Sequence, residues 1–126
     1  MTWHGLGRWD SLIELESAEL VRTFQPDLAA LASIGTRCVI VTAQGDKPGI
    51  DCVSRVFAPN AGISEDPVTG SAHCTLAAYW GGRLNRDTLL GEQASPRGGR
   101  VRMRIEADRV ALGGQAVTVA HVRLLV

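Results

Sequence analysis

Strong net charge and long apolar runs are both missing from this chain of 126 residues. Thirteen Lys and Arg residues balance thirteen Asp and Glu residues, so the composition gives no reason to expect nucleic acid as a partner. No apolar run approaches the roughly 20 residues of a membrane-spanning helix, so we expect no membrane association. Residues 1–10 lack a basic stretch followed by an apolar core, so we expect no secretory signal and a cytoplasmic location.

Cysteine is scarce as well, and its three occurrences, Cys38, Cys52 and Cys74, are far apart in the sequence. Each lies inside an apolar run. A scattered set of odd number fits neither a disulfide framework nor a zinc site. We therefore expect three buried free thiols and no metal site.

What the chain does contain is an ordinary globular composition, with 45% hydrophobic and 21% charged residues. A chain of this length can bury a single hydrophobic core. No internal repeat, linker or low-complexity segment divides the sequence. We therefore predict one domain over residues 1–126.

The first half of the sequence predicts short strands and short helices. Residues 10–16 alternate apolar and polar side chains, which is typical of a strand. Ser17 and Pro26 then stand where they favour the starts of two short helices. Further strands are expected over residues 37–43 and 50–59, which contain β-branched runs and end at turn-forming residues.

The second half predicts one long helix followed by strands. Residues 71–84 have almost no polar face before Arg83, so we expect a helix buried on most sides. Residues 84–99 form a predicted polar connection, and residues 100–126 contain three runs of period two that predict antiparallel strands. In the first run Val101 and its apolar neighbours share one face. The predicted class is α+β, with a mixed, mainly antiparallel sheet wrapped around a central apolar helix.

The segment "GISEDPVTGSAHC", residues 62–74, leads from a strand end into the N-terminus of that helix. The first N–H groups of a helix lack intrahelical partners, and the helix dipole adds partial positive charge there. Thr69 and Ser71 place hydroxyl groups beside these N–H groups, and Gly70 permits the close approach of a ligand. Such an N-terminus suits a carboxylate or phosphate, with Asp66 at its edge as an acceptor or acid/base group.

A purely structural interpretation of the same residues is also open. Thr69 or Ser71 can cap the helix, and Asp66 can complement the helix dipole from the preceding turn. The glycine spacing and the missing lysine exclude a Walker A or dinucleotide-binding loop. Residues alone therefore leave two alternatives, a capped helix and a binding site.

The string "SRVFAPNAGISEDPVTGSAHCTLAAYW", residues 54–80, resembles the C-terminal lobe of the PhzF-like phenazine-biosynthesis family. Looser similarity covers essentially the whole chain, through "LIELES", "QPDLAAL", "VIVTA" and "RGGRVRMRIEADRVALGGQAVTV". The resemblance implies one lobe of the diaminopimelate epimerase fold. In that fold each lobe is a sheet around a central helix, and the active site lies between two lobes.

The resemblance further implies a cofactor-free isomerase that moves a proton on a small carboxylate-bearing molecule in a biosynthetic process. Asp66 matches the C-lobe aspartate of the family and is the implied catalytic residue. The implied substrate-binding residues follow it at the start of the helix: Thr69, Gly70, Ser71 and Ala72. His73 lies three residues after Gly70, where it can face the cleft, so we include it among the substrate-binding residues. Thr69 and Ala72 would act through their backbone N–H groups.

Only the C-terminal lobe is covered by the resemblance, because the main acid/base glutamate of the family lies in an N-terminal lobe. We therefore expect a partner, either a second copy in a homodimer or a separate chain that supplies the other lobe. A lobe without its neighbour exposes apolar surface, which a partner would cover. The alternative function is a non-catalytic carboxylate-binding or dimerisation module.

Overall fold

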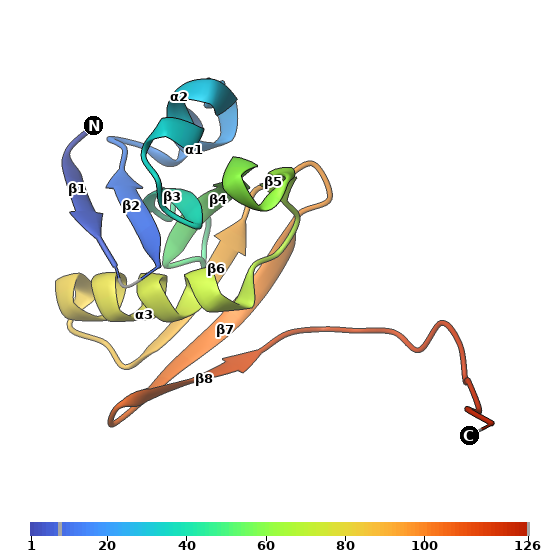
Figure 1. Ribbon diagram of the computed structural model, residues 1–126. Helices are drawn as coiled ribbons and strands as arrows, with labels where there is room; N and C mark the ends of the chain where they lie inside the picture. The colour runs from blue at the N-terminus through green and yellow to red at the C-terminus, as the bar shows by residue number, and fades with distance from the viewer. Residues whose placement is uncertain (8, 126) are drawn as a thin grey trace.

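The computed structural model describes residues 1–7 and 9–125, with the layout drawn in Figure 1. Its helices and strands follow the chain in this order: β1 (Trp3–Leu6), β2 (Asp10–Glu14), α1 (Ala18–Thr23), α2 (Leu28–Ser33), β3 (Cys38–Gln44), β4 (Cys52–Ala58), η1 (Pro59–Ala61), β5 (Ile63–Asp66), α3 (Gly70–Leu84), β6 (Thr88–Gln93), β7 (Gly99–Glu106) and β8 (Arg109–Gly113). None of the helices in these described ranges has the length and apolar character needed to span a bilayer.

The strands form one sheet in the order β1-β2-β3-β4-β6-β7-β8, and β5 pairs with β4 beside that path. Two neighbouring pairs, β2–β3 and β4–β6, are parallel, whereas the other pairs are antiparallel. The predicted α+β class with a mainly antiparallel sheet is therefore confirmed.

The two parallel pairs explain why helices cover both faces of the sheet. β2 connects to β3 through α1 and α2, and β4 connects to β6 through β5 and α3. Each connection leads to a neighbouring strand on the same side, towards β8. Because β3 and β4 are antiparallel, however, the strands of the β2–β3 unit and those of the β4–β6 unit point in opposite directions. Right-handed crossovers then place their helices on opposite faces. Figure 1 shows α1 and α2 on one side of the sheet and α3 on the other.

Alternating side chains of β3 and β4 build a separate core under each helical layer. Ile40 and Val56 pack in the core with Leu76 of α3. Val39 and Phe57 face the other way and pack in the core that contains Val21 of α1. Because successive side chains of a strand point to opposite faces, the β-branched runs of these two strands serve both cores.

Helix α3 is buried along one face only, which corrects the expectation of burial on most sides. Leu76, Ala77 and Trp80 are at most 2% exposed. The opposite face carries Cys74 and Ala78, which are exposed. These side chains are small, so leaving them in water costs little apolar burial. The correction extends to the thiols, because Cys38 and Cys52 are buried and Cys74 is not.

The two short helices begin where the sequence predicts. The Ser17 hydroxyl accepts a hydrogen bond from the Leu20 N–H at 3.2 Å, which caps α1. The Asp27 carboxylate accepts from the Ala30 N–H at 3.0 Å and caps α2. Both caps satisfy N–H groups that the first turn of a helix leaves without partners.

Strand β6 replaces part of the polar connection predicted over residues 84–99, so that prediction is wrong. Leu89, Gly91 and Gln93 alternate along β6 and are all buried. A glycine and a glutamine at core positions hide the period-two pattern. Gly91 leaves room for the imidazole of His73, because a Cβ at this glycine would lie 3.2 Å from its Cδ2 atom. Strands β1 and β5 were not predicted either, and both are short and contain no buried residue.

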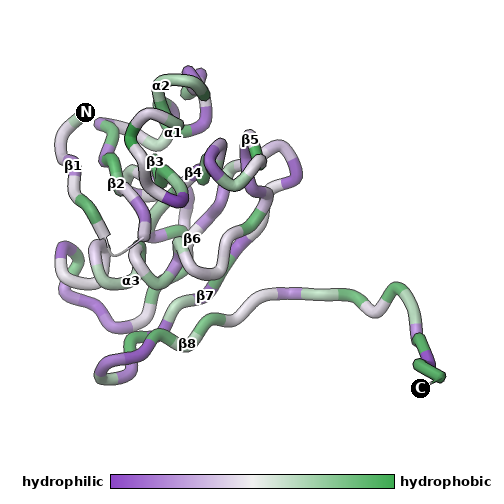
Figure 2. Tube along the Cα trace, viewed as in Figure 1, coloured by the Kyte–Doolittle hydropathy of each residue, from purple (hydrophilic) through white to green (hydrophobic). Residues whose placement is uncertain are grey.

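The last of the three predicted C-terminal strands does not form in the structure. Residues 114–125 extend away from the body without helix or strand, as Figure 1 shows, and Val126 lies outside the described residues. Figure 2 shows many apolar residues along this free segment. Val117 is 84% exposed and Val119 is 91% exposed. A strand needs a neighbouring strand for its backbone hydrogen bonds, and no described strand lies beside this segment.

Candidate functional site

The candidate site is the start of α3, where a short loop connects it to β5. The helix begins at Gly70, one residue earlier than the predicted Ser71. Thr69 occupies the N-cap position, but its side chain makes no capping hydrogen bond. Gly70 and Ser71 are exposed. The first N–H groups of α3 therefore face solvent without a capping side chain, which leaves them available to an anion.

The hydroxyl group of Thr69, which could otherwise cap α3, is hydrogen-bonded to Asp66 instead. The Oγ1 atom of Thr69 donates a hydrogen bond to the Oδ2 atom of Asp66. This bond fixes the carboxylate of Asp66 at the end of β5, next to the first turn of α3. Neither the Thr69 nor the Ser71 side chain makes a capping hydrogen bond, so the side-chain cap of the structural interpretation does not form.

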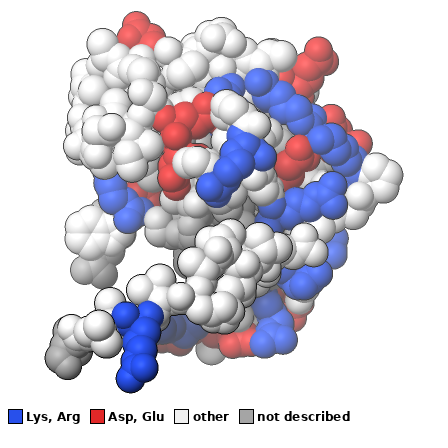
Figure 3. All heavy atoms as spheres, turned by 90° about the vertical axis from the view of Figure 1, so that its right-hand side faces the viewer, with Lys and Arg blue, Asp and Glu red and all other residues white. Residues whose placement is uncertain are grey.

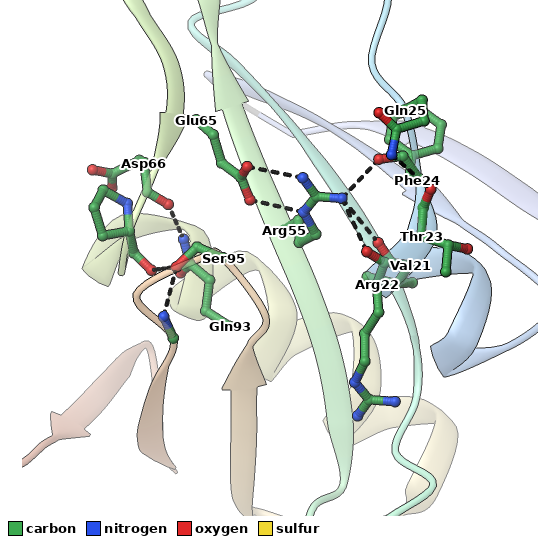
Figure 4. A network of polar contacts seen from close by, with 12 residues as sticks. Val21, Arg22, Thr23, Phe24, Gln25, Arg55, Glu65, Asp66, Gln93 and Ser95 are labelled. Carbon is green, nitrogen blue, oxygen red and sulfur yellow. Dashed lines mark hydrogen bonds and ion pairs between the residues drawn. The ribbon is translucent and has the colours of Figure 1, made fainter.

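Gln93, which was not predicted from the sequence, makes hydrogen bonds to both Asp66 and Thr69. Its Oε1 atom accepts from the Thr69 N–H at 2.8 Å, and its Nε2 atom donates to the Asp66 carbonyl at 2.7 Å and to Thr69 Oγ1 at 3.2 Å. The side chain is fully buried, and Figure 4 shows it between β6 and the loop. A buried amide with this many partners is a rigid support, because any loop movement breaks several hydrogen bonds.

The pairing of β4 explains why Gln93 and Asp66 meet. One edge of β4 pairs with β3 along most of its length. The other edge pairs with β6 at Ser54, opposite Gln93, and with β5 at Val56, opposite Asp66. The ends of β5 and β6 therefore lie next to each other although they are far apart in the sequence.

A second clamp holds the loop from the connection between β6 and β7. The Ser95 hydroxyl donates to the Pro67 carbonyl at 2.7 Å and accepts from the Gly98 N–H at 3.0 Å. Gly99 lies against Val68 so closely that an added Cβ would stand 2.3 Å from the Cγ2 atom of Val68. Only a glycine lets β7 begin at this distance from the loop.

A guanidinium group adds positive charge at the open end of α3. The Nη2 atom of Arg37 donates to Ser71 Oγ at 3.0 Å. Arg37 also makes three hydrogen bonds of 2.8–3.0 Å to Asp10, which is buried. The Asp10 carboxylate raises the pKa of Arg37, so this side chain stays charged. Its half-exposed position lets it share an anion with the helix N-terminus.

His73 takes a packing position at the start of α3. The imidazole is fully buried, and its Nδ1 atom lies 2.7 Å from the Thr69 carbonyl. That carbonyl can only accept, so Nδ1 carries the proton, and Nε2 has no hydrogen-bond partner in the described chain. Burial lowers the pKa of His73 despite the hydrogen bond to Thr69. The ring is therefore neutral and stabilises the first turn of α3.

We expect the neutral His73 to make folding sensitive to acid. The unfolded chain protonates this ring near pH 6.5, whereas the folded chain resists protonation. The unfolded state therefore binds more protons below that pH, and stability falls by up to about 1.4 kcal/mol per pH unit in this window. Urea unfolding at pH 7.5 and 5.5 should show this loss in the wild type and not in His73→Asn.

The exposed His4 provides the control for this pH effect. His4→Asn should keep the acid sensitivity of the wild type. In NMR titrations of the native protein, the His73 ring should titrate below the ordinary histidine value of 6.5. A His73 ring that titrates at or above that value would contradict its assignment as a buried neutral group.

The structure places the predicted residues in two groups. Asp66, Thr69, Gly70 and Ser71 surround the exposed start of α3, whereas Ala72 and His73 are buried beneath it. The supporting residues, Gln93 and Ser95 in one segment and Arg37 in another, carry no signal in the sequence near the motif. In the described ranges, no group of three or more His, Cys, Asp or Glu side chains is placed to hold a metal ion.

The family of this chain follows from comparison with known proteins. The sequence profile of the family described as PhzC-PhzF, phenazine biosynthesis-like protein, matches residues 1–122. The chain belongs to the phenazine biosynthesis-like family. This confirms the resemblance found in the motif of residues 54–80.

Relatives in this family include two bacterial proteins named as uncharacterized isomerases. The one from Pseudomonas aeruginosa is 52% identical over 120 residues, which cover 94% of this chain and 45% of the relative. The one from Halalkalibacterium halodurans is 46% identical over 121 residues, which cover 96% of this chain and 46% of the relative. The chain therefore spans about half the length of the curated relatives it matches.

Crystal structures of two relatives share the fold. The phenazine biosynthesis protein of the PhzF family from Enterococcus faecalis superposes with a TM-score of 0.86 at 46% identity, and the match covers 93% of this chain and 44% of that one. A putative phenazine biosynthesis PhzC/PhzF protein from Clostridium difficile gives 0.73 at 34% identity, covering 88% and 45%. These matches are consistent with one lobe of the diaminopimelate epimerase-like fold.

Proposed function

We propose that this chain supplies one half of an isomerase site that transfers a proton on a small carboxylate-bearing molecule without a cofactor. The observation that carries the proposal is the pairing of Asp66 with an uncapped helix N-terminus. The carboxylate is held by Thr69, and the first N–H groups of α3 stand open beside it. Membership in a family whose relatives are named isomerases supports the reaction class.

In the proposed site, α3 and Arg37 bind the substrate carboxylate. The N–H groups of Gly70 and Ser71 lie in the first turn, where the helix dipole favours negative charge. The Ala72 N–H belongs to the same turn. Arg37 already donates to Ser71 Oγ at 3.0 Å and would pair with the bound anion. The Thr69 N–H is used by Gln93, so Thr69 contributes through its bond to Asp66 instead.

Asp66 is the proposed acid/base group of this half. As a carboxylate it would take a proton from the carbon next to the substrate carboxylate, and the electron pair of that C–H bond would pass into an enolate-like anion. The N–H groups and Arg37 would stabilise the added negative charge. If Asp66 returns its proton to the same carbon or to another carbon of the conjugated system, its carboxylate is regenerated directly. If a second group delivers the proton instead, Asp66 releases its own proton to solvent and the second group takes one up, which completes the cycle.

The return of a proton from the opposite face requires a second group, so we propose that the lobe pairs with another lobe. Either a second copy of this chain or a separate N-lobe chain would complete the site. The exposed apolar segment 114–125 and the exposed face of α3 are the surfaces that such a partner would cover. Light scattering should give about twice the chain mass of 13.4 kDa for a homodimer, and a monomer at all concentrations would contradict self-pairing.

The proposed reaction predicts loss of hydrogen exchange in Asp66→Asn. Wild-type protein, with its partner lobe where one is needed, should exchange the hydrogen next to the carboxylate of a small amino or hydroxy acid with deuterated solvent. Asp66→Asn should lower that exchange by at least about a hundredfold, because a general acid/base group contributes roughly 10²–10⁴-fold. NMR of the substrate measures the exchange.

Matched controls separate the site from general effects on the fold. Asp108→Asn changes an aspartate in the exposed turn between β7 and β8, and Ser64→Ala changes an exposed serine of β5. Both should exchange like the wild type, whereas Ser71→Ala should weaken substrate binding. Equal activity of Asp66→Asn and Asp108→Asn would disprove the role of Asp66.

A second candidate function is a carboxylate-binding or dimerisation module without catalysis. The observation that favours it is the set of exposed apolar side chains in residues 114–125, such as Val117 and Val119, which suit an interface with another chain. This alternative predicts that a small carboxylate binds, that Ser71→Ala weakens the binding, and that no hydrogen exchange accompanies it. Free thiols at Cys38, Cys52 and Cys74 suit the reducing, cytoplasmic location that we propose for either function.

A further inference from the structure

A hollow of about 940 Å³ lies next to the loop of the candidate site, where Val68 forms part of its wall. The rest of the wall comes from β6, β7, the loop between these strands, the end of β8 and residues 114–115, which follow β8. Figure 3 shows the face of the molecule that is on the right in Figure 1, with Lys and Arg side chains in an arc along its right-hand border. The volume falls in the range of roughly 300–1,000 Å³ that small-molecule sites occupy.

Three arginines that line the hollow have no carboxylate partner within residues 1–7 and 9–125. Arg97, Arg100 and Arg102 make no ion pair with any described residue. By contrast Arg104, on the same face of the same strand, pairs with Glu106. The chain has a net charge of zero, so a group of three unpaired arginines is a local excess of positive charge.

The one carboxylate in the wall does not neutralise this excess. Glu92 lies opposite Arg100 across the β6–β7 pair, but its oxygens are bound by Arg22 at 2.9 Å and Lys47 at 2.8 Å. Although burial opposes the change, these two cations lower the pKa of Glu92. The glutamate therefore belongs to a separate ion-pair network. Arg102 has Leu90 and Gly113 as its cross-strand neighbours, and neither carries charge.

Glycines keep the hollow open around these guanidinium groups. Gly98, Gly99, Gly113 and Gly114 line it. An added Cβ at Gly114 would meet its first neighbour, the Arg100 carbonyl, only at 4.0 Å, so this part of the wall is not packed tightly. Two side chains that are two residues apart on one face of a strand are roughly 6.5–7 Å apart. Arg100 and Arg102 therefore suit two anionic groups carried by one molecule.

We propose that this hollow is a second binding site, and that it takes a small polyanion with two or more phosphate or carboxylate groups. Arg97, Arg100 and Arg102 would bind those groups, because guanidinium forms paired hydrogen bonds with both kinds of anion. This site is separate from the anion position at α3, because its lining includes neither Arg37 nor the first residues of α3. It stands independently of the proposed isomerase activity.

Calorimetric titration of the full chain with inorganic pyrophosphate, and separately with citrate, tests this site. Wild-type protein should bind at least one probe with a saturable, salt-sensitive isotherm, and the stronger probe identifies phosphate or carboxylate as the preferred group. Arg100→Gln with Arg102→Gln should weaken that binding at least tenfold. Both side chains are exposed, so the fold should tolerate the change, which circular dichroism checks.

A control pair removes the same amount of charge nearby. Arg104→Gln with Arg109→Gln changes two exposed arginines of β7 and β8 that do not line the hollow. This pair should keep the affinity within about twofold of the wild type. If neither probe gives a saturable isotherm, or if both double variants weaken binding equally, the arginines are only a solvated strand face and the proposal is wrong. Ser71→Ala should leave this binding unchanged, which separates the two anion positions.

Discussion

Gln93→Leu should destabilise the protein by about 2–4 kcal/mol and disable the candidate site. Leucine fits the buried position by size but cannot bond to the Thr69 N–H or the Asp66 carbonyl, which Gln93 satisfies at 2.8 and 2.7 Å. Each buried polar group left without a partner costs about 1–3 kcal/mol. Urea unfolding measures the loss of stability, and hydrogen exchange on the substrate measures the loss of function.

The matched control for this prediction is Gln25→Leu. Gln25 is exposed and makes one hydrogen bond, to the Thr23 carbonyl at 3.3 Å. Its replacement should change the free energy of unfolding by no more than about 0.5 kcal/mol, as is usual for surface positions. Gln93 would not be the support of the loop if its leucine variant were as stable as the Gln25 control.

Arg55→Met should be at least as harmful, with an expected loss of about 3–5 kcal/mol. The guanidinium of Arg55 binds both oxygens of Glu65 at 2.8 Å and donates to the Phe24 carbonyl at 2.7 Å. Figure 4 shows how this side chain connects β4 with β5 and with the end of α1. The Arg55 side chain is 12% exposed and that of Glu65 is 16% exposed. Removing one member leaves a largely buried charge without its partner, which is the costly case.

A double-mutant cycle isolates the ion pair from the carbonyl contacts. Glu65→Gln removes the negative charge, so Arg55→Met should cost less in that background than in the wild type. The difference should be about 1–3 kcal/mol, because contacting residues couple on this scale. Strictly additive losses in chemical denaturation would mean that Arg55 acts through the carbonyls of α1 alone. Glu65 precedes Asp66, so the same variants should also reduce the proposed activity.

Apolar periodicity and helix caps were enough to predict much of the fold. Strands β3 and β4 follow β-branched runs, and α1 begins after the predicted cap, Ser17. Strand β6 was missed because Gln93 fills a core position that a pattern of apolar residues would assign to solvent. The opposite error affects residues 116–125, where a good period-two pattern has no neighbouring strand.

The sequence predicted the loop residues of the candidate site, but it did not predict the distant residues that hold this loop in place. The residue types between Asp66 and Ser71, together with the family resemblance, located the start of α3. Gln93 and Arg37 reach that point from 24 and 34 residues away in the sequence. Such contacts depend on strand order, which local spacing does not encode. The exposed face of α3 was missed for a different reason, since small residues count as apolar but bury little surface.

Strands β3 and β4 contribute side chains to both cores, and this arrangement joins the two halves of the molecule into one cooperative unit. If α1 and α2 detached from the sheet, the side chains of Val39 and Phe57 would be exposed to water. The same two strands would then lose support for Ile40 and Val56, which pack towards α3. Local opening of one layer therefore propagates through the shared strands. Heat should melt the two layers in a single calorimetric transition rather than one after the other.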